Sequence, residues 1–165
     1  MYLSVNQDYS KTDCSIAKAE KNDCVVRSLV AATGVSYRTV HKYCKDKLGR
    51  VDKKGTPNTT MFAAFKKAES AGLKIGSKNF SITKLGTYDI KNMYRLKGQE
   101  IFRKKTLKSF IESHPKGTYL VLVAKHSLTV KDGELLDWKN NRFEPTRKVM
   151  GAYRLEEIDS QLKLF

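Results

Sequence analysis

The chain has 165 residues, 40% of them hydrophobic, which is ordinary for one folded domain with a buried core. Its 32 Lys and Arg against 17 Asp and Glu give a formal net charge of +15, which favours a polyanionic partner, although a well-solvated surface has the same composition. No apolar stretch approaches the roughly 20 residues of a membrane helix, and no phosphate-loop motif is present, so we expect no membrane contact and no cofactor.

Helices are expected in the first half of the chain. Residues 1–20 are polar and mixed, which predicts an irregular N-terminal arm. Apolar residues at helical spacing then predict three helices, which begin at 24, at 36 or 37 and at 58 or 59, and end at 33, 47 and 71. For the first helix, Asn22 or Asp23 is the expected N-cap and Gly34 the C-terminal stop. The apolar stripe of the third helix consists of Met61, Phe62, Phe65, Ala68 and Ala71.

Strands are expected in the second half. A short helix capped by Thr106 runs to His114, and before it the stretch 88–96 fits either a helix or a strand. The expected strands cover 79–83, 118–124, a hairpin over 126–138, and 148–155. Helices first and an antiparallel sheet afterwards predict an α+β fold, with residues 1–165 as a single domain.

Cys24 stands in the first turn of the first helix. A thiol at that position feels the positive end of the helix dipole, which favours the reactive thiolate. The three cysteines are odd in number and have no tight spacing, which predicts free thiols. Cys24 is therefore the candidate nucleophile, although most free cysteines are simply small buried hydrophobic residues.

His126 and Asp137 flank the expected hairpin. Asp132-Gly133 is a strong two-residue turn signal, and such a turn places Leu128 opposite Asp137. Because side chains alternate along a strand, His126 shares a face with Leu128, and Asp137 lies diagonally across on that face. We expect this face to be turned towards Cys24, so that thiol, imidazole and carboxylate form a nucleophile constellation.

These fragments, in this order, resemble the papain-like cysteine peptidases, in particular a small bacterial branch of that family. The resemblance covers most of residues 22–138: Asp23-Cys24 at a helix start, His126 four residues before Val130, and Asp137 at the end of the hairpin. The segment 22–28 also resembles small proteins encoded by tailed bacteriophages.

The resemblance implies a papain-like fold and a phage-encoded, thiol-dependent hydrolase of peptide or isopeptide-like amide bonds. Cys24 would be the nucleophile, His126 the base and Asp137 the residue that orients the imidazole. Where the family has a glutamine before the nucleophile, this chain has Lys18, so Asn22 or the backbone N–H of Cys24 would have to stabilise the oxyanion. One missing donor typically costs on the order of 100- to 1000-fold in turnover.

Two other functions remain open. One is a catalytically inert papain-like scaffold that acts as a basic nucleic-acid-binding or virion protein, in the cytoplasm of the bacterial host or in the virion. Its cationic candidates are Lys91, Arg95, Arg103, Lys104 and Lys105, among which aromatic residues are interleaved. The other is a zinc site at Cys14, Cys24, His41 and Cys44, but these spacings match no usual zinc module, so we expect no metal.

Overall fold

The computed structural model describes residues 14–136 and 145–158 of the chain. Within these ranges the helices are α1 (Ser15–Ala19), α2 (Cys24–Thr33), α3 (Tyr37–Lys47), α4 (Asn58–Ala71), α5 (Thr87–Ile90) and α6 (Leu107–Ser113). The strands are β1 (Leu73–Ile75), β2 (Lys78–Lys84), β3 (Lys91–Leu96), β4 (Gln99–Lys104), β5 (Thr118–Val123), β6 (His126–Lys131), β7 (Glu134–Leu136) and β8 (Val149–Ile158). No helix in the described ranges is long and apolar enough to cross a membrane.

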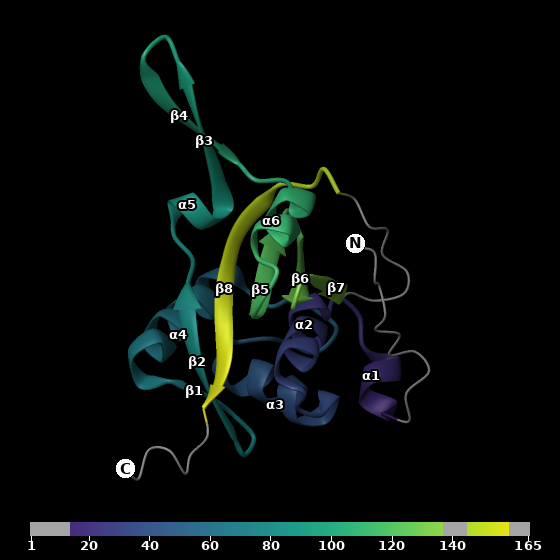
Figure 1. Ribbon diagram of the computed structural model, residues 1–165. Helices are drawn as coiled ribbons and strands as arrows, with labels where there is room; N and C mark the ends of the chain where they lie inside the picture. The colour runs from purple at the N-terminus through teal and green to yellow at the C-terminus, as the bar shows by residue number, and fades with distance from the viewer. Residues whose placement is uncertain (1–13, 137–144, 159–165) are drawn as a thin grey trace, which may run out of the picture.

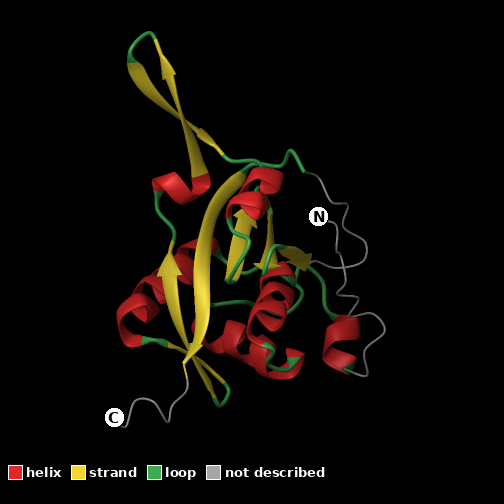
Figure 2. Cartoon of the chain, in the orientation of Figure 1, coloured by secondary structure: helices red, strands yellow, loops and turns green. Residues whose placement is uncertain are grey.

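Six of the strands form one antiparallel sheet in the order β1-β2-β8-β5-β6-β7. The long strand β8 joins the two halves of this sheet, because it pairs with β2 on one side and β5 on the other. Helices α2, α3 and α4 lie together beside the sheet, and α6 lies at its other end in the view of Figures 1 and 2. The predicted α+β class, with N-terminal helices and an antiparallel sheet, is confirmed.

The sheet is apolar on both faces. Alternate residues of β5 divide between two buried clusters: Leu120 packs with Leu29 of α2 and Phe65 of α4, whereas Val121 packs with Phe110 of α6. This double covering explains the continuous apolar run of β5, which a sheet with one solvated face would not need.

Helix α2 begins and ends at the predicted residues. Gly34 has a left-handed φ of 70° and its N–H donates to Val30 O at 2.9 Å, as a C-terminal stop should. Asp23 stands at the N-cap position but makes no capping hydrogen bond with its side chain. Its buried carboxylate instead accepts hydrogen bonds from Tyr37 Oη at 2.5 Å and Arg27 Nε at 2.8 Å, which fixes the start of α2 against α3.

Two expectations about the helices are wrong. The predicted irregular arm contains α1, whose Ala17 is buried against the main helical core. The helix is too short to show an amphipathic period in the sequence, and its order comes from this packing. Phe62 was expected in the core but is 42% exposed, because it turns from the buried side of α4 towards a cavity.

Strands β3 and β4 form a separate two-stranded ribbon that projects from the rest of the molecule (Figure 1). The stretch 88–96, which fitted either state, is thus divided between α5 and β3. At the base of the ribbon, Lys105 N–H donates to Ile90 O at 2.8 Å, and Tyr88 and Phe102 meet edge to face with ring centroids 5.5 Å apart. These contacts tie the ribbon to the body at its base.

Candidate active site

Cys24 and His126, which are far apart in the sequence, meet where α2 packs against β6. Cys24 is the first residue of α2 and His126 the first residue of β6. The side chain of His126 and the backbone and side chain of Ser127 lie beside the Cys24 sulfur and stabilise its thiolate. The sulfur therefore lies among several donors at the positive end of a helix, the environment that favours a thiolate.

The electrostatics of this environment act on the Cys24 thiol in two directions. Burial on its own raises its pKa, because a thiolate is poorly solvated in the protein interior. The hydrogen bonds from His126 and Ser127 and the charge of His126 outweigh burial, so that the pKa of Cys24 is lowered from its ordinary value. Cys44 shows the contrast, because burial raises its pKa to about 12 and the charge of Arg50 offsets only part of that rise.

A polar contact between α2 and β6 fixes the two reacting groups in place. Ser28 Oγ donates to Cys24 O at 2.6 Å and lies 3.0 Å from Ser127 Oγ. Two residues further along β6, Thr129 Oγ1 donates to Ser28 O at 2.6 Å. These buried hydrogen bonds set the position of α2 along β6, and with it the position of Cys24 beside His126.

The face of β6 that meets α2 carries Ser127 and Thr129. Leu128 and Val130 lie on the opposite face, in the cluster that includes α6. The expectation that the face of Leu128 is turned towards the nucleophile helix is therefore wrong. His126 reaches Cys24 because it is the first residue of the strand, at the end of the sheet.

The hairpin turn is the predicted one. Asp132 and Gly133 have φ values of 48° and 76°, as a two-residue type I′ turn requires, and Thr129 pairs with Leu136. Asp137, the expected orienting carboxylate, lies outside the described residues.

A cavity of about 580 Å³ opens beside the Cys24–His126 pair. Its wall is mainly apolar, and it includes the half-exposed side chains of Phe62 and Met150. The loop between α3 and α4 contributes Gly55 and Thr56, and β8 contributes the segment 150–153. A cavity of this size beside a hydrogen-bonded thiol can hold the side chain and backbone of a bound segment.

Asn22, the candidate oxyanion donor, is not among the described residues that line this cavity. Its Nδ2 donates to Lys53 O at 3.1 Å, while the N–H of Lys53 donates to Glu20 Oε1 at 3.1 Å. The segment just before Cys24 thus holds both backbone groups of Lys53, and it fixes the loop that carries Gly55 and Thr56.

Thr56 is a site residue that the sequence reading missed. Its Oγ1 is buried and, within the described part of the chain, has no hydrogen-bond partner, although Thr56 lines the cavity. A buried hydroxyl left unpaired costs free energy. The only sequence signal was its place between Gly55 and Pro57, which predicts a loop and no function.

Replacing Thr56 by valine is expected to raise the free energy of unfolding by about 1 kcal/mol, because an unpaired buried hydroxyl is replaced by a methyl group of the same shape. Thr129→Val is the matched control: it removes a hydroxyl that donates to Ser28 O, and we expect a loss of about 1 to 2 kcal/mol. Chemical denaturation of both variants measures the difference. A loss of stability in Thr56→Val would show that its hydroxyl is already paired.

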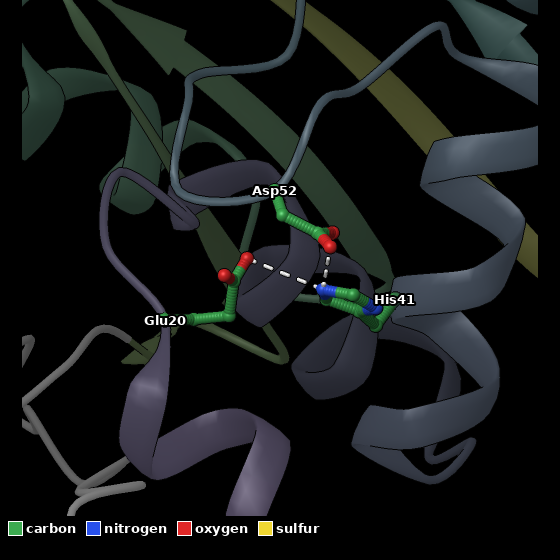
Figure 3. Close-up of side chains that lie close together, drawn as sticks. All are labelled: Glu20, His41 and Asp52. Atoms are coloured by element: carbon green, nitrogen blue, oxygen red, sulfur yellow. Dashed lines mark hydrogen bonds and ion pairs between the residues drawn. The ribbon is translucent and has the colours of Figure 1, made fainter.

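A partly buried ion-pair network joins the segment after α1, helix α3 and the loop after α3 (Figure 3). His41 Nε2 lies 3.2 Å from Glu20 Oε2 and 3.5 Å from Asp52 Oδ1. Glu20 also pairs with Arg50, whose side chain is completely buried, and Arg50 Nη2 donates to Lys21 O at 3.1 Å. Glu20 thereby connects the segment after α1 to helix α3 and to the loop that carries Gly55 and Thr56.

Glu20, His41 and Asp52 have the donor atoms of a metal site. Both carboxylates, however, already face cationic side chains, Glu20 that of Arg50 and Asp52 that of Lys45 at 3.3 Å. Their charge is thereby balanced without a metal ion, and the arrangement is an ion-pair network. Among the described residues no group of possible metal ligands includes Cys14, Cys24 or Cys44, so the zinc alternative is not assembled.

Four of the five cationic candidates, Lys91, Arg95, Arg103 and Lys104, lie on the β3–β4 ribbon. Lys105 was expected on the same surface, but it is buried and its Nζ donates to Ser113 Oγ at 3.0 Å. It follows the last residue of β4 and anchors the base of the ribbon, a position that charge composition alone does not reveal.

Comparison of this chain with protein-family models, with curated proteins and with solved structures finds no match.

Proposed function

We propose that this protein is a thiol-dependent hydrolase of peptide or isopeptide-like amide bonds with a papain-like arrangement, encoded by a bacteriophage. The observation that carries the proposal is the hydrogen bond between His126 and the sulfur of Cys24, at a helix start and beside a cavity. A helix that begins with the nucleophile and packs on an antiparallel sheet supports the papain-like part of the proposal. Its place of action would be the host cytoplasm or the virion.

The reaction would proceed in two steps. The Cys24 thiolate attacks the amide carbonyl, a C–S bond forms, and the C–N bond breaks as protonated His126 gives its proton to the leaving amine. Water, deprotonated by His126, then attacks the thioester and releases the acid and free Cys24. Asp137 would orient the imidazole in both steps.

The developing oxyanion needs a donor in place of Asn22, whose amide is bonded to Lys53. The backbone N–H of Cys24 is one such donor, because the first N–H groups of a helix have no intrahelical acceptor. The apolar rim at Phe62 and Met150 favours substrates with an apolar side chain near the cleaved bond.

The decisive experiment measures cleavage of an internally quenched peptide library and of a branched Lys isopeptide by the wild type and by Cys24→Ala. We expect turnover by the wild type and none by Cys24→Ala, with Cys24→Ser as a shape-matched control for folding. An inactive wild type, or a Cys24→Ala variant that still cleaves, would contradict the hydrolase.

The second candidate is an inert scaffold that works by binding. The observation that favours it is the position of Asn22, which leaves the expected oxyanion donor outside the cavity wall. This candidate requires that Cys24→Ala keep the biological effect of the protein, whereas the hydrolase requires that the effect be lost.

A further inference from the structure

The β3–β4 ribbon exposes apolar and cationic side chains together. Tyr94 is 50% and Leu96 56% exposed. Both lie on β3, which pairs only with β4. With six residues in each strand, the ribbon extends roughly 20 Å. A projecting ribbon with large exposed apolar residues marks an interaction surface rather than a structural element.

The charge of the ribbon is strongly one-sided. Five of its residues, Lys91, Arg95, Lys97, Arg103 and Lys104, are cationic, and Glu100 is its one acid. Glu100 lies 3.6 Å from Arg95, which leaves the other four cations without an acidic neighbour among the residues of the ribbon. The ribbon therefore fits an anionic partner.

The register of the ribbon adds a second, independent argument. Lys91 and Lys104 are directly opposite each other at its base. Like charges at opposed positions of an antiparallel pair destabilise it. An anion bound between or beside the two ammonium groups would remove this repulsion, so the pair indicates a binding site for an anionic group such as a phosphate.

We propose that the β3–β4 ribbon is an arm that binds the phosphate backbone of duplex DNA, independently of the Cys24 site. A two-stranded ribbon fits the major groove of B-form DNA, and the cations along both of its strands then face phosphates on either side. Leu96, next to the Lys97-Gly98 turn, would lie against base edges at the tip.

A duplex fits the ribbon better than a single strand does. Single-strand binding relies on aromatic rings that are free to stack on bases. Here the guanidinium of Arg103 lies over the ring of Tyr94, 5.6 Å from its centroid, and Tyr88 packs edge to face against Phe102. Arg103 thus covers one face of the Tyr94 ring, and Phe102 already has an aromatic neighbour, so the ribbon offers cations for phosphates more than open ring faces for bases.

Fluorescence anisotropy with a labelled duplex of about two helical turns tests the proposal. We expect Lys91→Glu/Lys104→Glu to weaken binding by about 10-fold or more at low salt, and to reduce the slope of log affinity against log salt by about 2, one unit for each lost phosphate contact. This double variant keeps like charges opposite each other, so the repulsion within the ribbon does not change.

Lys66→Glu/Lys67→Glu is the matched control, because it changes the net charge equally at two exposed residues of α4, away from the ribbon (Figure 1). We expect it to weaken binding by less than about 3-fold. Lys104→Glu alone creates an opposite-charge pair with Lys91, and should weaken binding while leaving the thermal midpoint unchanged or higher.

Four outcomes would overturn the proposal: no binding of the wild type at low salt, equal weakening by the ribbon and α4 variants, tighter binding of a single strand than of the duplex, or competition by polyglutamate as effective as by unlabelled duplex. The last would assign the ribbon to an acidic protein. Because the α4 and ribbon variants leave Cys24 untouched, the assay is independent of the proposed hydrolase.

Discussion

Glu20→Ala is expected to lower the free energy of unfolding by about 3 to 5 kcal/mol, which is the usual cost of removing one partner from a buried ion pair. The variant would leave the guanidinium of Arg50 without its carboxylate, and because Arg50 is only 2% exposed, water cannot replace that partner. It would also remove the acceptor for Lys53 N–H and one partner of His41. Urea denaturation monitored by circular dichroism measures the change.

Two further variants separate the buried charge from other effects. In Glu20→Ala/Arg50→Met no unpaired charge is left in the interior, so we expect most of the lost stability to return. Asp46→Ala is the exposed control, because it breaks the solvent-exposed pair of Lys42 and Asp46, and it should not change stability measurably. If Glu20→Ala were as stable as Asp46→Ala, the network would not hold the loop in place.

His126→Ala is expected to reduce hydrolytic turnover by about 100- to 10,000-fold, the range that general acid–base catalysis contributes. It should also slow the alkylation of Cys24 by iodoacetamide near neutral pH. In the wild type, hydrogen bonds and the charge of His126 hold the pKa of Cys24 below its ordinary value despite burial. Without His126 the effect of burial prevails, the pKa rises, and the thiolate fraction at neutral pH falls.

The measurement is the pH dependence of labelling at each cysteine, followed by mass spectrometry. In the wild type, Cys24 should react first, and its pH midpoint should move upward in His126→Ala. Cys44 is an internal control for folding, because its buried thiol, with a pKa of about 12, should stay slow in both proteins. A Cys24 that reacts equally fast with and without His126, while Cys44 stays protected, would contradict the proposed pair.

The elements that the sequence predicted well are those with a local signal. Helix α2 has an apolar period and a C-terminal glycine, and the β6–β7 hairpin has Asp132-Gly133 as its turn. From these two elements the candidates Cys24 and His126 could be named, and the structure places their side chains in contact.

The features that the sequence did not predict depend on contacts between distant residues. Alternation divides the residues of β6 into two sets but does not say which set faces α2, and because both faces of the sheet are covered, hydrophobicity does not decide it. Thr56 lines the cavity only because of the way its loop folds. The Asn22 side chain does not line the cavity, and its Nδ2 donates to Lys53 O instead. Neither arrangement leaves a local pattern in the sequence.

Strand β8 has a consequence for the order in which the molecule is assembled during synthesis. It is the last described element of the chain, yet it lies between β2 and β5 and supplies the cavity wall at 150–153. While β8 is still inside the ribosome, the emerged part of the chain can form the β5–β6 hairpin and the helices. It cannot join the two halves of the sheet, because β8 is the strand between them. The cavity beside Cys24 therefore gains its wall at 150–153 only after β8 has left the ribosome, later than the helices and the β5–β6 hairpin can form.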